Sequence, residues 1–258
     1  MNKGMRRTVI VLLLVLVLGL TNWFLGRKPK DRVTVEPVGL DTAARAVEVD
    51  LTLAMQKPDG DTTVAVEAIR GEETERVDLS LDSDGRYTGR VSLPLGQEAR
   101  VEAVITRNGR VERETLRTYE DTRSLLPVRV KRCMWDVPKY QEGSLATLNG
   151  VLTTQIHELE LSGVESGAGG VELRGYVGDT LVQTVPGEWD PESGSYSTRV
   201  LEVPCKAADT VRITVFCHDA DGVAYEFTHG RWKITADGKA EKASEQAADS
   251  YPALTWPE

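Results

Sequence analysis

Apolar and polar residues alternate in short runs over most of the chain, a pattern typical of β-strands with one buried face. The clearest run places five apolar side chains on one side: Val47, Val49, Leu51, Leu53 and Met55. Similar runs predict strands at 63–69, 76–81, 87–93, 100–106 and 110–118. Asp-Gly at 84–85 and Asn-Gly at 108–109 supply turns between them. The pattern therefore predicts six or seven short strands in the first half and almost no helix.

The second half repeats this order of strands and turns, because residues 84–112 align with residues 193–226. A three-residue insertion separates the later matches in the second copy. Each copy has a strand with a tyrosine and valine face, a proline that ends it, a second alternating strand and a glycine turn. The matched pairs are Gly85 with Gly194, Tyr87 with Tyr196, Val91 with Val200, Pro94 with Pro204, Val101 with Val211 and Gly109 with Gly222.

These shared positions and the strand count resemble the immunoglobulin-like or fibronectin type III-like β-sandwich domains of bacterial membrane-anchored surface proteins. The resemblance is to an architecture, since residues 43–131 contain no cysteine or tryptophan of the antibody type. It implies an all-β fold of two tandem sandwiches, at 43–131 and 145–235. We expect an inter-domain linker at 132–144 and a flexible acidic tail at 236–258.

An uncharged segment from residue 8 to residue 26 lies between two basic clusters. As a helix it would be roughly 28 Å long, close to the thickness of a bilayer's hydrocarbon core. The alternative is a cleaved signal peptide, but Thr-Asn-Trp-Phe-Leu after residue 20 lacks the small residues of a cleavage site. We expect a cytoplasmic tail at 1–7, a transmembrane signal anchor at 8–26 and a juxtamembrane linker at 27–42. The bulk of the chain would then be extracytoplasmic.

Charge and cysteine usage narrow the functional classes. Residues 33–258 carry 24 basic and 39 acidic side chains, a net charge of −15, which argues against nucleic-acid binding over the whole surface. Three cysteines are too few for a disulfide-dense module. Cys217 falls in phase with inward apolar residues, although a bridge to Cys205 stays open.

Catalytic and metal-binding signals are weak. The D-x-D-G sequences at 82–85 and 219–222 could offer oxygen ligands to calcium, but Asp and Gly are also what tight turns require. We expect turns there, with no metal site, no cofactor and no catalytic residue.

One basic and aromatic cluster stands out in the acidic portion: Arg129, Lys131, Arg132, Met134, Trp135 and Tyr140. Such residues carry much of the energy of protein interfaces, so they are candidates for partner binding. The alternative is that Met134 and Trp135 fill the junction between domains. Trp256 joins the candidates because it ends a possible docking peptide with Tyr251 and Leu254.

The sequence favours a non-enzymatic, membrane-anchored extracytoplasmic protein that binds a protein partner or assembles in the envelope. The alternative function is a module that binds glycan or a cell-wall polymer, which would need Trp189, Trp232 and Tyr176 on one exposed face. An extracytoplasmic hydrolase is the third hypothesis. The sequence does not set the oligomeric state.

Overall fold

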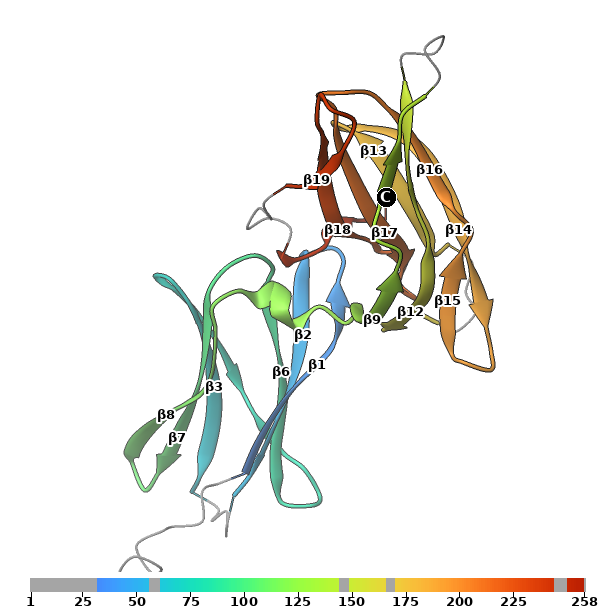
Figure 1. The fold of residues 1–258 in the computed structure, drawn as a ribbon. Helices are drawn as coiled ribbons and strands as arrows, with labels where there is room; N and C mark the ends of the chain where they lie inside the picture. Colours follow the sequence, from blue (N-terminus) through green and yellow to red (C-terminus); the bar gives the residue numbers. More distant parts are fainter. Residues whose placement is uncertain (1–31, 56–60, 144–148, 166–169, 244–249, 258) are drawn as a thin grey trace, which may run out of the picture.

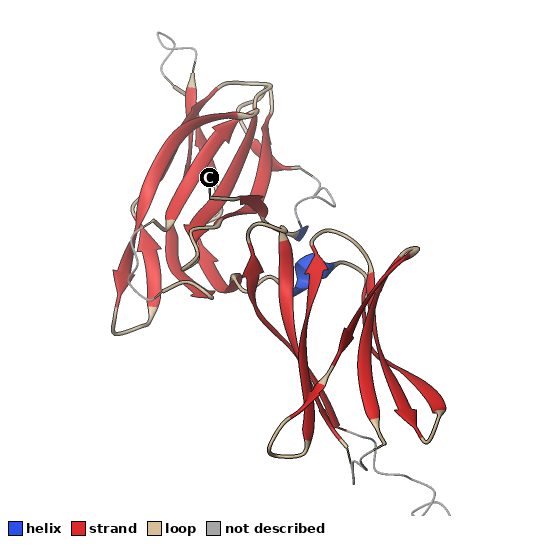
Figure 2. Cartoon of the chain, turned by 180° about the vertical axis from the view of Figure 1, so that it is seen from behind, coloured by secondary structure: helices blue, strands red, loops and turns tan. Residues whose placement is uncertain are grey.

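The computed structural model of this chain describes residues 32–55, 61–143, 149–165, 170–243 and 250–257. These residues form strands β1 to β20 and one short 3-10 helix, η1 (Thr122–Leu125), so the all-β prediction is confirmed. Figures 1 and 2 show the strands in two separate regions with η1 between them. Within the described ranges, no helix is long and apolar enough to cross a bilayer. The predicted anchor at 8–26 and the tail at 1–7 lie outside the described residues.

The first group of strands forms two antiparallel four-stranded sheets, ordered β1-β2-β6-β5 and β4-β3-β7-β8. Its core lies between them, and the inward side chains of β2 are at most 2% exposed, as the alternation predicts. Asn108 and Gly109 both have positive φ in the two-residue turn between β7 and β8. The bounds are β1 (Arg32–Asp41), β2 (Ala46–Ala54), β3 (Thr63–Arg70), β4 (Glu73–Asp78), β5 (Ser80–Leu81), β6 (Arg86–Pro94), β7 (Ala99–Arg107) and β8 (Arg110–Tyr119).

The strand order of this group is that of an immunoglobulin-type sandwich. If β1 to β8 are lettered A, B, C, C′, D, E, F and G, the sheets read A-B-E-D and C′-C-F-G. The chain changes sheets at Leu79, between β4 and β5, where the Leu79 amide donates to the Val64 carbonyl at 2.8 Å. The order supports an immunoglobulin-like architecture independently of any sequence motif.

The prediction of a juxtamembrane linker at 27–42 is wrong for its larger part, because β1 occupies Arg32–Asp41 and pairs with β2. Val33 and Val35 pack against the core and Leu40 is buried, so this segment has a strand's alternation. Pro37 is tolerated because β1 is an edge strand and the register shifts beside it, at Val38.

The second group contains the remaining strands, in a nine-stranded sheet and a three-stranded sheet. The larger sheet runs β19-β18-β17-β13-β14-β15-β12-β9, with β20 also paired to β18, and the smaller runs β10-β11-β16. The bounds are β9 (Arg129–Trp135), β10 (Lys139–Gln141), β11 (Gly150–Thr154), β12 (Ile156–Ser162), β13 (Glu172–Val177), β14 (Thr180–Asp190), β15 (Ser195–Thr198), β16 (Leu201–Cys205), β17 (Thr210–His218), β18 (Ala224–Ile234), β19 (Ala240–Lys242) and β20 (Ala253–Thr255).

The repeat seen in the sequence has a structural counterpart. Tyr87 on β6 and Tyr196 on β15 are both buried, and each hydroxyl donates to a loop carbonyl, of Thr62 at 3.0 Å and of Glu165 at 3.2 Å. The matched valines differ, because Val91 is buried inside β6 whereas Val200 is 48% exposed in the gap between β15 and β16. The single strand β6 of the first group therefore corresponds to two strands, β15 and β16, in the second group.

The predicted inter-domain linker at 132–144 is also corrected. Its first residues complete β9 and β10 follows, and both pair with strands of the second group. The first group ends at η1, and buried Leu126 and Val128 connect it to β9. A run of basic and aromatic residues concealed these strands, because it lacks regular alternation.

The predicted flexible tail at 236–258 contains β19 and β20, so it is corrected where the structure describes it. β19 pairs with one end of β18 and β20 with the other, at Ala224–Glu226. Leu254 and Trp256 pack against the core, which gives a short polar segment the apolar anchors that it needs.

Each described outer strand carries a feature that discourages pairing with another chain. β1 has Pro37 and a bulge, and β9 has Lys131 in a bulge. β4 and β8 are rich in charged residues, β16 contains Pro204, and β5, β10, β19 and β20 have only two or three residues. Such features block the addition of a strand from a neighbouring molecule.

Candidate functional site

Five of the predicted partner-binding residues lie on one strand, β9, at the end of the nine-stranded sheet. The Arg129 guanidinium donates to the carbonyls of Ser124 and Leu126, the latter at 3.2 Å, so it fastens η1 to β9. Arg132 forms ion pairs with Glu158 at 3.0 Å and Glu160 at 4.0 Å on β12. These two arginines therefore serve the fold as well as the surface.

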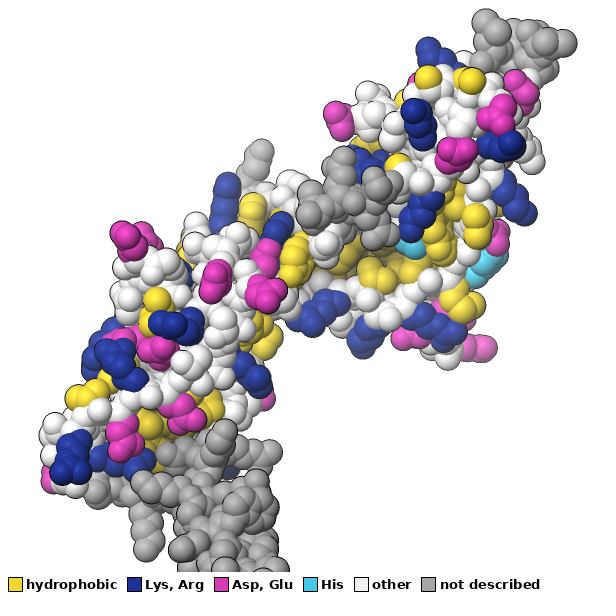
Figure 3. Space-filling view, turned by 60° about the vertical axis from the view of Figure 1, so that its left-hand side comes forward, with side chains coloured by type: hydrophobic (Ala, Val, Ile, Leu, Met, Phe, Trp, Pro, Cys, Tyr) yellow, Lys and Arg dark blue, Asp and Glu magenta, His cyan; other side chains and the backbone are white. Residues whose placement is uncertain are grey.

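The remaining side chains of this region form an exposed surface. Lys131 is the extra residue of a bulge, opposite the Glu160–Leu161 step of β12, and its side chain is exposed. Met134 is 44% exposed, and Val137, just beyond the strand, is 76% exposed. We call Lys131, Met134 and Val137 the β9 patch. In Figure 3, hydrophobic side chains gather around histidines in the upper region, while the lower region mixes both signs of charge.

Trp135 turns inward and closes an aromatic cluster between β9 and β18. Its ring lies edge-on to His229, 3.3 Å between centroids, and 5.3 Å from the ring of Trp232. The Trp232 ring also fills the space beside Gly230, where a β-carbon would collide with it. Trp135 thus fits the alternative hypothesis of a packing residue better than that of a partner-binding one.

His229 is the polar member of this cluster. It is the extra residue of a second bulge, since Ile213 and Thr214 on β17 pair with Gly230 and Thr228. Its Nε2 atom is buried and has no hydrogen-bond partner in the described part of the chain. Burial, with a smaller contribution from the Lys242 charge, lowers the pKa of His229 from 6.5 to about 4. The imidazole is therefore neutral at physiological pH.

Tyr140 and Trp256 lie apart from the β9 patch. Tyr140 belongs to β10, where its ring occupies the space beside Gly150 on β11. Trp256 follows β20 and packs against the core near the start of β18. The sequence-predicted set is therefore divided among three places.

A crevice of about 360 Å³ separates η1 and β9 from the C-terminal segment. The Arg123 guanidinium stacks over the Tyr251 ring at 4.6 Å, and its nitrogens also bond the Asp121 carboxylate, at 2.6 Å for the closest pair. This contact links the C-terminal segment, through η1, to the first group. The lining residues are Arg123, Ser124, Leu126, Val128, Arg129, Val130, Phe227, Thr228, Ser250, Tyr251 and Pro252.

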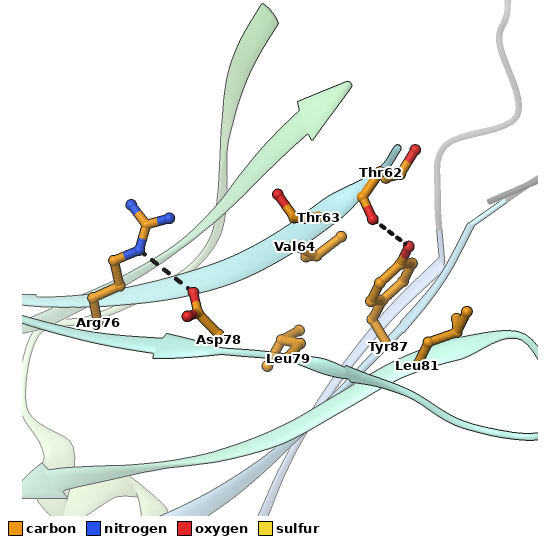
Figure 4. A pocket seen from close by; sticks show the side chains of 8 residues that line it. All are labelled: Thr62, Thr63, Val64, Arg76, Asp78, Leu79, Leu81 and Tyr87. Atoms are coloured by element: carbon orange, nitrogen blue, oxygen red, sulfur yellow. Dashed lines mark hydrogen bonds and ion pairs between the residues drawn. The ribbon is translucent and has the colours of Figure 1, made fainter. Parts of the chain in front are cut away.

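A second hollow, of about 510 Å³, opens in the first group where the chain changes sheets (Figure 4). The Tyr87 hydroxyl closes one end by bonding the Thr62 carbonyl, and Arg76 and Asp78 form an ion pair at 3.6 Å at the other. Leu79 lies between them, and Leu81, which pairs with Tyr87 across β5 and β6, is 53% exposed. Polar and apolar residues contribute equally to the lining, and its two charged side chains, Arg76 and Asp78, pair with each other.

The aspartates of the D-x-D-G sequences serve as turn residues. One Asp82 oxygen accepts from the amides of Asp84 at 2.9 Å and Arg86 at 2.8 Å. One Asp219 oxygen accepts in the same way from Asp221 at 3.0 Å and Val223 at 2.9 Å. No group of three or more His, Cys, Asp or Glu side chains suited to a metal occurs among the described residues.

All three cysteines are free, so Cys205 and Cys217 are not bridged. Cys217 is fully buried on the inward side of β17, as its phase predicts. Burial raises the pKa of Cys133 to about 11 and that of Cys217 to about 12, with a smaller contribution from Asp219 to the latter. Both are protonated at neutral pH, which makes them poor nucleophiles.

The three aromatic residues required by the glycan alternative do not share an exposed face. Trp232 is 4% and Tyr176 8% exposed, and Trp189 is half-buried against Tyr196, 4.8 Å between ring centroids. A sugar ring needs an open aromatic face, so these three cannot form a stacking platform together.

Sequence reasoning missed the outward face of β13 and β17, where arginines cover aromatic rings. The Arg174 guanidinium lies 3.3 Å from the centroid of Phe216, and that of Arg212 lies 4.0 Å from the centroid of Tyr176. Arg174 also pairs with Glu172 at 2.7 Å. The signal was the alternation of Glu172, Arg174 and Tyr176, but only the register between strands shows which side chains meet.

Comparison with known proteins gives little further guidance. No protein-family model matches the chain, and no curated protein matches it. A marsupial T cell receptor structure is similar over 78% of this chain and 62% of its own, with 11% identity and a TM-score of 0.25. A maltogenic amylase from S. marinus is similar over 87% of this chain and 31% of its own, with 9% identity and a TM-score of 0.23. The chain thus spans less than two thirds of either structure, and the fold argument stands on strand order.

Proposed function

We propose that this chain is a non-enzymatic, membrane-anchored extracytoplasmic protein that uses tandem immunoglobulin-like sandwiches to bind a protein partner or to assemble in the cell envelope. The N-terminus would lie in the cytoplasm and the strand-rich bulk outside, held near the bilayer by the helix proposed at 8–26. Anchoring would raise the effective concentration toward a partner in the same membrane.

The observation that carries this proposal is the β9 patch. Met134 exposes apolar surface on β9, with the Arg132 guanidinium 3.2 Å from its sulfur, and Lys131 is exposed in the bulge of the same strand. Val137 exposes further apolar surface just beyond the strand. Apolar side chains on a rigid support, next to a cation, give the composition of protein interfaces. An acidic chain with such a surface would favour a partner that brings an apolar side chain flanked by carboxylates.

Site-specific photocrosslinking of the full chain in its native membrane tests this proposal. A photoreactive residue replaces Val137 or Met134, and a matched control replaces Val111, which is 60% exposed on β8 of the first group. We expect one identified envelope protein to be captured from both β9 positions and not from the control. Lys131→Glu should then reduce capture several-fold, because it reverses the charge next to the contact.

Two results would contradict the proposal. Equal capture from Val137 and Val111 would show that exposure alone explains the crosslinks. Retention of the protein on wall polysaccharide, with no specific protein captured, would favour the glycan-binding alternative. Protease treatment of intact cells tests the topology, since the proposed orientation exposes the strand-rich portion to the added protease.

A further inference from the structure

The outward face of the sheet β14-β13-β17-β18 is an ordered grid of side chains. Leu173 and Ile213 point into the core, so their neighbours on β13 and β17 point outward. The strand register then arranges the outward residues in three rows across the four strands. Row one is Leu181, Tyr176, Arg212 and Arg231; row two is Thr184, Arg174, Thr214 and Thr228; row three is Pro186, Glu172, Phe216 and Glu226.

Several side chains of this face are held by contacts with one another. The stacked guanidiniums of Arg174 and Arg212 are held over their rings, and Glu226 accepts from the Thr214 hydroxyl at 2.7 Å and lies 3.8 Å from Arg212. Thr214 is fully buried although it points away from the core. Side chains fixed in this way lose little conformational entropy on binding, which favours association.

The rows differ in chemistry from one edge of the grid to the other. Row one has an exposed leucine, 45% accessible, a tyrosine and two arginines, whereas row three has a proline, a phenylalanine and two glutamates. One edge is therefore basic and the other acidic. A surface with this arrangement complements a second copy of itself when the rows are exchanged.

A twofold axis that lies between the two faces and runs along row two makes this exchange. Rotation about it places each strand opposite the same strand of the second copy, with the strand direction reversed. Row one of one copy then faces row three of the other, strand by strand. Arg231 meets the second copy's Glu226, Arg212 its Phe216, Tyr176 its Glu172, and Leu181 its Pro186. Three of these pairs are favourable: an ion pair, a hydroxyl on a carboxylate and an apolar contact. The Phe216 ring is already covered by Arg174 of its own copy, so the fourth pair contributes no cation–π contact.

We propose that this face is an interface between two copies of this chain. Four strands with three outward residues on each cover roughly 400 Å² per copy, about half of the approximately 800 Å² of a standard interface. The dimer is therefore weak and forms when the local concentration is high. This proposal uses a different surface from the β9 patch and does not depend on the function proposed above.

Chemical crosslinking of the full chain in nanodiscs tests the interface. Thr184 is exposed and lies on row two, so Thr184→Cys places two cysteines opposite each other across the axis. A bismaleimide that spans about 8 Å suits sheets that pack face to face at about 10 Å. Val111→Cys, on β8, is the matched control, and the unsubstituted chain measures the background from the half-buried Cys133.

We expect a dimer band from Thr184→Cys and none above background from Val111→Cys. Adding Leu181→Asp should lower that band about tenfold, because it places a carboxylate against the second copy's proline. Mixing Leu181→Asp chains with Pro186→Lys chains, both carrying Thr184→Cys, should restore it. Equal crosslinking from Thr184→Cys and Val111→Cys, or no effect of Leu181→Asp, would overturn the proposal.

Discussion

Mild acid should weaken the second group of strands through one side chain, His229. The imidazole projects from β18 against Trp135, its buried Nε2 atom is unpartnered in the described structure, and its pKa is about 4. In the unfolded chain the same group takes up a proton near 6.5. The free energy of unfolding is therefore highest above pH 6.5 and decreases as the pH falls toward 4. Below pH 4 the folded form is also protonated, so the loss stops there.

The size of the effect follows from the two pKa values. Their difference corresponds to about 3 kcal/mol when the pH has fallen below both. Between pH 7.5 and pH 5 the loss is about 2 kcal/mol, because most of the proton uptake by the unfolded chain has then occurred. The Lys242 charge acts in the same direction, since it too disfavours the protonated imidazole.

Urea unfolding of the full chain in detergent, followed by tryptophan fluorescence, measures this loss. Four of the five tryptophans, Trp135, Trp189, Trp232 and Trp256, lie in the second group, so the change in signal reports mainly on that group, and Trp23→Phe removes the fifth. His229→Phe and His229→Leu cannot be protonated, and their stability should fall about 2 kcal/mol less than that of the unsubstituted chain between pH 7.5 and 5. If the unsubstituted chain and a folded variant lose the same stability, the reasoning about His229 is wrong.

Three further predictions concern packing and the C-terminal segment. Gly175→Ala should destabilise the chain by about 1–3 kcal/mol in the same urea assay, because the added β-carbon would overlap Val203. Gly39→Ala is the control: no atom lies within 4 Å of its added β-carbon, so stability should change by less than about 0.5 kcal/mol. Tyr196→Phe should cost about 1 kcal/mol, since a buried hydroxyl bond is lost, and an unchanged urea midpoint would contradict this. Tyr251→Ala should speed hydrogen exchange in β20 severalfold, because it removes the cation–π contact with Arg123, worth about 0.5–1 kcal/mol.

The sequence predicted the strands in which apolar and polar residues alternate regularly and missed those in which this alternation is interrupted. Val47 to Met55 alternate without a break, and β2 is where the pattern predicts it. β1 was missed because residues 27–42 were predicted as a linker, and Pro37 interrupts the alternation, although an edge strand tolerates it beside a bulge. β9 was missed for a related reason, since the bulge at Lys131 disrupts its alternation.

The candidate sites depended on information that a linear pattern does not contain. The sequence named Met134 and Trp135 alike as candidates, but Met134 is exposed, whereas the ring of Trp135 packs against His229 on β18. The arginine-covered rings were missed because Arg212 and Tyr176 are far apart in sequence and become partners only through the register of β13 and β17. Pairing between strands is a non-local property, and an alternation pattern specifies faces without specifying neighbours.

The bulged, short and charged outer strands have a consequence for how this chain could diversify. Pairing through main-chain hydrogen bonds accepts almost any sequence, so an open strand would make every related chain a potential partner. With the described edges closed to that route, partner choice rests on individual side chains, where one exchange can redirect recognition and leave the fold intact. Selection could then tune the outward rows independently of the inward ones, so that a single scaffold yields many non-cross-reacting variants.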